Sequence, residues 1–160
     1  MQQYCINCSK RDSKAVVAHE GESCADVAAG YGDSLRQYLH HITENILNMG
    51  CPTCNAAFLD FSGCCAVTCF CRQDFCGLCL APMANSSVCH AHVMVCKLNP
   101  GNCYFCSTSE LNEVHRRTRI DKLRRYFAEN IPKGDVKRRV MKRCEVILAD
   151  VGISIQDIMG

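Results

Sequence analysis

The sequence predicts a small metal-stabilised domain flanked by α-helices, with mostly helical and irregular structure and little β structure. The chain has 16 cysteines among 160 residues, no tryptophan and only 7% aromatic residues. A chain with so few large aromatic side chains needs disulfides or metal in addition to an apolar core. The cysteines concentrate in the middle, and apolar residues recur at helical spacing on both sides of them.

The spacing of the cysteines decides between the two kinds of cross-link. Four C-x2-C pairs occur, namely Cys5 and Cys8, Cys51 and Cys54, Cys76 and Cys79, and Cys103 and Cys106. This spacing lets two thiolates reach one tetrahedral zinc ion, at about 2.3 Å from each sulfur. A disulfide framework has no reason to favour it. We therefore expect a zinc-ribbon-like domain that binds two to three Zn²⁺ ions.

The cellular compartment follows from the same pattern. The N-terminal stretch MQQYCINCSKRDSK lacks the apolar core of a signal peptide. No stretch approaches the roughly 20 apolar residues that a membrane span requires. Thiols kept for metal are typical of reducing compartments, so we expect a cytoplasmic or nuclear protein without membrane association.

A first zinc site is predicted in the polar segment 1–24, which contains the pattern C-x2-C-x10-H-x4-C. Its four ligands would be Cys5, Cys8, His19 and Cys24. The alternative is a chain end that carries incidental thiols.

The next segment, 25–50, is predicted to contain an amphipathic helix over 33–49. Asp33 or Ser34 suits its N-terminal cap, and Gly50 suits its C-terminal stop. The apolar residues at helical spacing are Leu35, Tyr38, Leu39, Ile42, Ile46 and Met49.

Segment 51–106 shows no helical period and is dense in cysteine, so metal is predicted to determine its fold. Taken pairwise, the ligands of a first site are Cys51, Cys54, Cys69 and Cys71. The ligands of a second site are Cys76, Cys79, His92 and Cys96. His92 is preferred to His90 because residues i and i+4 meet on one face of a helical turn, which leaves His90 free.

This assignment leaves Cys64 and Cys65 unused, directly after Gly63. A thiol on a glycine turn, near zinc sites and backbone amides, suits a nucleophile, because the thiolate is the attacking species. The alternative is that one of the two binds zinc in place of Cys71. The residues alone leave both interpretations open.

The whole pattern begins with CPTC, followed by nine residues between Cys54 and Cys64, the last of which is Gly63. Four residues separate Cys64 from Cys69, and FC-x2-C and a later His and Cys follow. It resembles the catalytic second RING domain of RING-between-RING ubiquitin ligases. The resemblance implies that Cys64 accepts ubiquitin from an E2 as a thioester and passes it to an amine. It also implies that the eight ligands named above bind zinc.

The implied partners are an E2–ubiquitin conjugate, ubiquitin and a protein substrate. The family usually has a histidine two residues after the nucleophile, where this chain has Ala66. His90 is therefore the candidate general base for the incoming amine. Two alternatives remain: a noncatalytic zinc-binding interaction module, like the in-between domain of the same ligases, and a conventional E2-activating RING.

Region 107–160 is predicted to form two helices. The first covers 107–131, with Ser107 and Glu110 spaced as a capping box and Pro132 at its end. Its apolar stripe comprises Leu111, Val114, Leu123, Phe127 and Ile131.

The second helix is predicted over 135–151, with Asp135 as its cap and Gly152 as its stop. Its core-facing residues are Val136, Val140, Cys144, Ile147 and Val151. Cys144 is interpreted as a small buried apolar residue rather than a ligand.

Basic residues are segregated onto these helices. Twelve of the 18 Lys and Arg residues lie between His115 and Arg143, while the whole chain carries a formal charge of only +2. They form either solvated helix faces or a docking surface for an acidic partner. Nucleic acid is an unlikely partner, because no base-reading motif with interleaved aromatic residues is present.

One further set of thiols is left over. Cys103 and Cys106, with Cys89 or His115, do not make four convincing ligands, so these thiols are expected to be unligated.

Overall fold

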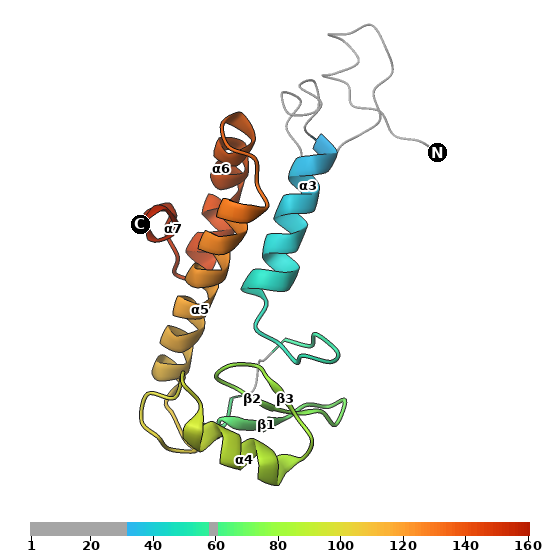
Figure 1. Cartoon of the computed structure of the whole chain (residues 1–160), viewed down its shortest axis with the longest axis vertical. Helices are drawn as coiled ribbons and strands as arrows, with labels where there is room; N and C mark the ends of the chain where they lie inside the picture. Colours follow the sequence, from blue (N-terminus) through green and yellow to red (C-terminus); the bar gives the residue numbers. More distant parts are fainter. Residues whose placement is uncertain (1–31, 58–60) are drawn as a thin grey trace, which may run out of the picture.

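The computed structural model describes residues 32–57 and 61–160. Long helices lie side by side in one half of an elongated molecule, and a small sheet with one short helix forms the other half (Figure 1). The elements are α3 (Gly32–His41), the π-helix η1 (Ile42–Leu47), β1 (Ala66–Thr68), β2 (Asp74–Cys76), β3 (Pro82–Met83), α4 (Ser86–Val95), α5 (Thr108–Glu129), α6 (Asp135–Asp150) and α7 (Ile155–Met159). This helix-rich fold with little β structure agrees with the predicted class.

The helical half has its own apolar core, made by α3, η1, α5 and α6. Its fully buried members include Leu35, Ile42, Leu123, Val140, Cys144 and Leu148. Most members of the predicted apolar stripes are buried in this core or packed against it, which confirms the stripes. Leu111 and Val114 pack instead in the cluster of the cysteine-rich half, and Met49 is buried but follows the end of the helix. Cys144 is wholly buried among them, and burial raises the pKa of its thiol to about 12.

The first helix differs from its prediction at both ends. It begins at Gly32, so Asp33 and Ser34 lie in its first turn rather than at the cap. It continues as the π-helix η1 and ends at Leu47, short of the predicted residue 49. Periodicity located the helix, but its apolar pattern does not distinguish an α-turn from a wider π-turn.

Gly50 was predicted to stop this helix, and that prediction was wrong. The C-cap is Asn48, and Gly50 instead forms an isolated β-bridge with Ala57. A Cβ atom at Gly50 would lie 2.5 Å from the carbonyl oxygen of Ala56. Glycine is needed here because the loop of the first C-x2-C pair folds back closely against its backbone.

The capping box of α5 is confirmed. The Ser107 side chain accepts from the Glu110 backbone N–H, and the Glu110 carboxylate accepts from the Ser107 N–H. These bonds and the hydrogen bond to the Ser107 hydroxyl hold the pKa of Glu110 below its usual value. The helix ends at Glu129, before the predicted residue 131.

The start of α6 corrects a second cap prediction. Gly134 is the N-cap, and Asp135 is the first helical residue without a capping bond. Its carboxylate accepts hydrogen bonds from Arg138 and Arg139 at 2.6 Å instead. Gly152 follows the helix at a φ of +69°, as its predicted stop role requires.

A short C-terminal helix, α7, was not predicted. Ser154 and Asp157 form a second capping box at its start. The pattern was visible in the sequence, but five residues are too few to show a helical period.

The cysteine-rich half contains one antiparallel sheet of order β1-β2-β3, with Val67 opposite Phe75 and Phe75 opposite Pro82. Helix α4 packs on the sheet and buries Cys89 and Val93. This ten-residue helix is longer than the single helical turn expected around His92 and Cys96. Val88 and Val95 are exposed while Cys89 and Val93 are buried, so its apolar residues do not form the single stripe by which a helix is recognised.

Helix α5 belongs to both halves. Leu111 and Val114 pack in the cluster around the second set of cysteines, whereas Leu123 packs in the helical core. His115 is 4% exposed, and its Nε2 lies 2.7 Å from the carbonyl oxygen of Gly77. Burial lowers its pKa, so the neutral ring donates to that carbonyl. The basic helix is thereby anchored on the Cys76–Cys79 loop.

Across the described ranges, none of the helices combines the length and the apolar composition needed to cross a bilayer.

Candidate metal centres and a cysteine–histidine pair

The first group of potential ligands joins two loops. Cys51 and Cys54 follow η1, and Cys69 and Cys71 lie in the turn between β1 and β2. Their four sulfurs lie within 4.8 Å of one another, with 3.6 Å between Cys51 and Cys71 and between Cys54 and Cys69. A tetrahedral zinc ion with bonds of about 2.3 Å separates its sulfurs by roughly 3.8 Å. The sulfurs therefore have the spacing that such an ion requires.

Each loop of this group is shaped by backbone hydrogen bonds. The N–H of Asn55 donates to the Cys51 carbonyl, and the N–H of Arg72 donates to the Cys69 carbonyl. Asn55 and Arg72 both have a positive φ, so the chain reverses direction directly after Cys54 and directly after Cys71. Burial opposes ionisation of Cys51, but backbone hydrogen bonds from Cys54 and Thr53 outweigh it and lower its pKa to about 7.

The second group is more deeply buried. Cys76 ends β2, Cys79 completes the following turn, His92 lies on α4, and Cys96 is the C-cap of that helix. The Sγ of Cys79 lies 3.3 Å from Nε2 of His92. A hydrogen bond from the Cys76 thiol lowers the pKa of Cys79 to about 4. Burial opposes this shift, and hydrogen bonds from the Ala81 backbone and from His92 add to it.

The structure brings together the same eight side chains that the spacing predicted as ligands. Cys71, rather than Cys64 or Cys65, completes the first group, and His92, rather than His90, completes the second. Four thiolates, and three thiolates with one imidazole, are donor sets typical of structural zinc. Both groups fit zinc, and their occupation by zinc stays a prediction. The predicted N-terminal ligands Cys5, Cys8, His19 and Cys24 lie outside the described residues.

The two residues predicted as catalytic also lie together. The Sγ of Cys64 is 3.8 Å from Nε2 of His90, although 26 positions separate them in the chain. Cys64 follows Gly63, which has a φ of +98° and directs the chain into β1. His90 lies in the middle of α4, which packs against β1. The pair belongs to neither group of metal-type ligands.

Hydrogen bonding orients the histidine. Nδ1 of His90 lies 2.8 Å from the carbonyl oxygen of Ser86, one helical turn earlier. A carbonyl only accepts, so Nδ1 carries the proton and Nε2 presents a lone pair toward Cys64. The ring of Tyr104 packs edge-on, with its centroid 5.4 Å from that of His90. The imidazole is thus held in the tautomer that can take a proton from the thiol.

A segment that sequence analysis missed holds the Cys64 turn in place. The Cys65 N–H donates to the Tyr104 carbonyl at 2.7 Å, and the Cys106 N–H donates to the Gly63 carbonyl at 3.0 Å. Cys64 itself forms a β-bridge with Phe105. Residues 104–106 therefore add a short extended edge beside 63–65. The pairing joins residues about 40 positions apart, and no local pattern signals it.

Cys64 and Cys65 differ in access. Cys64 is partly exposed, whereas Cys65 has no exposed surface and its Sγ lies 2.9 Å from that of Cys106. Burial and the neighbouring Cys106 thiol raise the pKa of Cys65. Of the two adjacent thiols, only Cys64 is open to a partner.

The remaining thiols form no third group among the residues that the structure describes. Cys89 is buried in α4, Cys103 is exposed, and His115 contacts Gly77.

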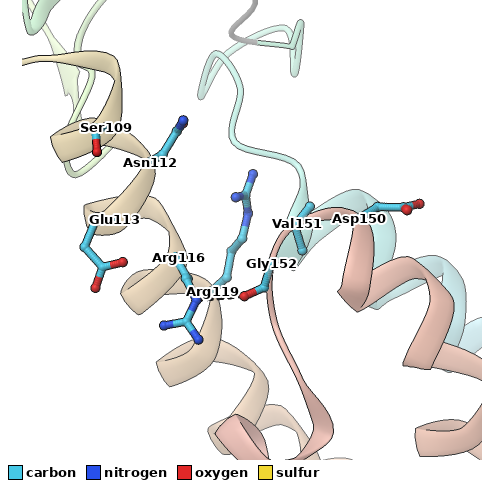
Figure 2. A pocket seen from close by; sticks show the side chains of 8 residues that line it. All are labelled: Ser109, Asn112, Glu113, Arg116, Arg119, Asp150, Val151 and Gly152. Atoms are coloured by element: carbon cyan, nitrogen blue, oxygen red, sulfur yellow. Dashed lines mark hydrogen bonds between the residues drawn. The ribbon is translucent and has the colours of Figure 1, made fainter.

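Two of the basic residues on α5 connect this helix to other elements of the fold. Arg116 donates to the Gly152 carbonyl at 2.8 Å and pairs with Asp157 at 2.9 Å, and Arg119 donates to the Leu47 carbonyl at 2.9 Å. Figure 2 shows both side chains projecting from α5 beside the end of α6. The two arginines line a hollow of about 690 Å³ together with polar, acidic and small residues, and both already have hydrogen-bond partners.

The described residues thus hold two groups of metal-type ligands and one cysteine–histidine pair. Comparison with protein-family models, with curated proteins and with solved structures finds no match to this chain.

Proposed function

We propose that this protein is a transthiolating E3 ubiquitin ligase module stabilised by structural zinc. Cys64 accepts ubiquitin from an E2 as a thioester and transfers it to an amine of a protein substrate. The observation that carries the proposal is the 3.8 Å contact between Cys64 Sγ and His90 Nε2, made by residues outside both groups of metal-type ligands. The resemblance of the Cys51–Cys96 pattern to the second RING of RING-between-RING ligases supplies the reaction class. A cytoplasmic or nuclear location follows from the same assignment.

Zinc has a supporting role in this proposal. Each group offers four protein ligands, which is the closed arrangement of structural rather than catalytic zinc. Bound ions would tie the loop after η1 to the β1–β2 turn, and the end of β2 to α4. Both Cys64 and His90 lie on elements fixed in this way, so metal would position them without touching the reacting atoms.

The first step is an exchange of thioesters. His90 Nε2 takes the proton of the Cys64 thiol, and the thiolate attacks the C-terminal carbonyl carbon of ubiquitin on the E2 cysteine. The new C–S bond forms, and the E2 sulfur leaves with its electron pair and takes the proton from His90, which frees Nε2 for the second step. Because a thioester replaces a thioester, the step is nearly balanced in energy. Positioning of the two sulfurs therefore supplies most of the catalysis.

The second step transfers ubiquitin to nitrogen. The substrate amine attacks the same carbonyl carbon, its proton passes to His90 Nε2, and the Cys64 thiolate leaves. The hydrogen bond from Nδ1 of His90 to the Ser86 carbonyl keeps Nε2 able to accept that proton. Partial exposure of Cys64 admits the donor and the acceptor, while buried Cys65 stays out of the reaction.

A charged E2–ubiquitin conjugate tests the proposal. Mixed with the zinc-loaded protein, it is expected to give an adduct that a reducing agent releases. Cys64→Ser should give an adduct that resists reduction, or none, with unchanged zinc content. Cys65→Ser is the matched control and should keep a reducible adduct. Absence of an adduct in a folded, zinc-loaded protein across several E2 enzymes would favour the noncatalytic interaction module.

A further inference from the structure

The sulfurs of Cys65 and Cys106 lie closer together than the sulfur pairs in the first group of metal-type ligands. Their Sγ atoms are 2.9 Å apart, compared with 3.6 Å for the sulfur pairs in the first group of metal-type ligands. Neither residue belongs to a group that could hold metal. The proposed ubiquitin transfer uses neither sulfur, so this pair has no assigned role.

The backbone pairing places the two residues diagonally across two adjacent segments. The Cys65 N–H donates to Tyr104 and the Cys106 N–H donates to Gly63, so the two cysteines extend from paired segments on either side of the Cys64–Phe105 bridge. A disulfide has an S–S bond of about 2.05 Å. The two sulfurs already lie 2.9 Å apart, so formation of a bond here needs only a small approach of the sulfurs.

We propose that Cys65 and Cys106 are a thiol-oxidation site that a peroxide converts into a disulfide. This inference goes beyond the proposed function and does not depend on it. Cys106 is partly exposed and Cys65 is wholly buried, so Cys106 is the residue that meets the oxidant.

The chemistry proceeds in two steps. The Cys106 sulfur attacks one oxygen of hydrogen peroxide, the O–O bond breaks, and the products are a Cys106 sulfenic acid and water. The Cys65 sulfur then attacks the Cys106 sulfur, the S–O bond breaks, and the S–S bond forms with release of a second water. The two sulfurs together give two electrons to the peroxide, and the chain loses two hydrogens.

Oxidation would link the 104–106 segment covalently to the turn that carries Cys64. The Cys65 and Cys106 N–H groups, which already donate across this pairing, would then exchange with solvent more slowly. Cys64 keeps a free thiol in this state, because the bond forms between its neighbour and the opposite strand. The modification therefore restrains the site without consuming the nucleophile.

Peptide mapping tests the proposal on the zinc-loaded full chain. The protein is treated with about one equivalent of hydrogen peroxide, alkylated, digested without reductant and analysed by mass spectrometry, while an indicator dye follows zinc release. The expected product is a Cys65–Cys106 cross-linked peptide that appears before zinc is released and disappears with reductant. Fragment spectra separate Cys65 from Cys64, and the link should persist in Cys64→Ser.

Two variants complete the test. Cys106→Ser should abolish the link, and Cys103→Ser, which changes an exposed neighbour, should leave it intact. Cys65→Ala removes the other partner without burying a hydroxyl, in case a serine there perturbs folding. The proposal is overturned if Cys65 and Cys106 stay reduced while other cysteines oxidise, if Cys64 is the linked residue, or if Cys106→Ser lowers the zinc content.

Discussion

His90 presents Nε2 to the Cys64 sulfur at 3.8 Å while its Nδ1 is 2.8 Å from the Ser86 carbonyl oxygen. The imidazole belongs to α4, which follows all three strands of the sheet in the sequence. It reaches the thiol because that helix packs on β1. Ala66, two residues after Cys64, lies in β1 and pairs with Cys76. The proposed general base therefore lies far from the proposed nucleophile in the sequence but close to it in the fold.

The first prediction concerns this histidine. His90→Gln should slow transfer of ubiquitin from Cys64 to free lysine by about 10²-fold or more, because the general base is lost. Single-turnover discharge of a preformed thioester measures this step directly.

The matched control is the neighbouring histidine of α4. His92→Gln should lower the zinc content by one equivalent, since His92 lies in the second group of metal-type ligands, whereas His90→Gln should not. If both variants lose metal, His90 is a structural residue. If His90→Gln discharges at the wild-type rate, it is not the base.

The second prediction concerns metal content. Elemental analysis should find two zinc ions held by the described residues, with a third if the predicted N-terminal site also binds. Cys76→Ser should remove one ion and the cooperative unfolding transition of the cysteine-rich half, because each structural site contributes on the order of 10 kcal/mol to folding. Cys89→Ser is the control, as Cys89 is buried in the same half but lies outside both groups. Disulfides in place of zinc would overturn the assignment.

The third prediction uses Cys144. Burial raises the pKa of this thiol from about 9 to about 12, so the unfolded chain ionises it at a lower pH than the folded chain does. Its contribution to stability is present below pH 9 and is lost as the pH rises toward 12. The difference in free energy of unfolding between wild type and Cys144→Ala should narrow by about 1 kcal/mol between pH 8 and pH 10. Urea titrations at the two pH values measure it, and a constant difference would contradict the burial effect.

The fourth prediction separates two arginines of α5. Arg116 is partly buried, pairs with Asp157 and donates to the Gly152 carbonyl, whereas Arg117 makes an exposed pair with Glu113. Arg116→Ala should lower the free energy of unfolding by about 1 to 2 kcal/mol, and Arg117→Ala by about 0.5 kcal/mol or less. Thermal unfolding of the zinc-loaded variants checks the order. Equal effects would mean that the junction with α7 contributes little.

Most of the local order could be predicted from the sequence. Helical periods located α3, α5 and α6, and the Ser107 capping box marked the start of α5, because these signals depend on neighbours within a few residues. The two groups of ligands also followed from spacing, since C-x2-C fixes two ligands locally and leaves few ways to combine the pairs.

The remaining features depend on contacts that no local pattern contains. Gly50 follows a helix, so the sequence suggested that it ends that helix. A glycine is needed there for another reason, because the chain folds back and the Ala56 carbonyl oxygen lies close to it. The register of 104–106 beside 63–65 arises from tertiary packing, and the close approach of Cys65 to Cys106 follows from it. Helix α4 exposes Val88 and Val95 while it buries Val93, so its apolar residues do not show a single stripe that would reveal it.

The most direct test of the central claim uses ubiquitin with an electrophilic group at its C-terminus, which reacts without an E2. The zinc-loaded protein should form one covalent adduct, and peptide mapping should place it on Cys64. Cys64→Ser should abolish this adduct, and Cys65→Ser should retain it, because only Cys64 is exposed and paired with His90. An adduct on Cys65 alone, or no adduct on either cysteine in a folded protein with full zinc content, would contradict the assignment of Cys64 as the ubiquitin acceptor.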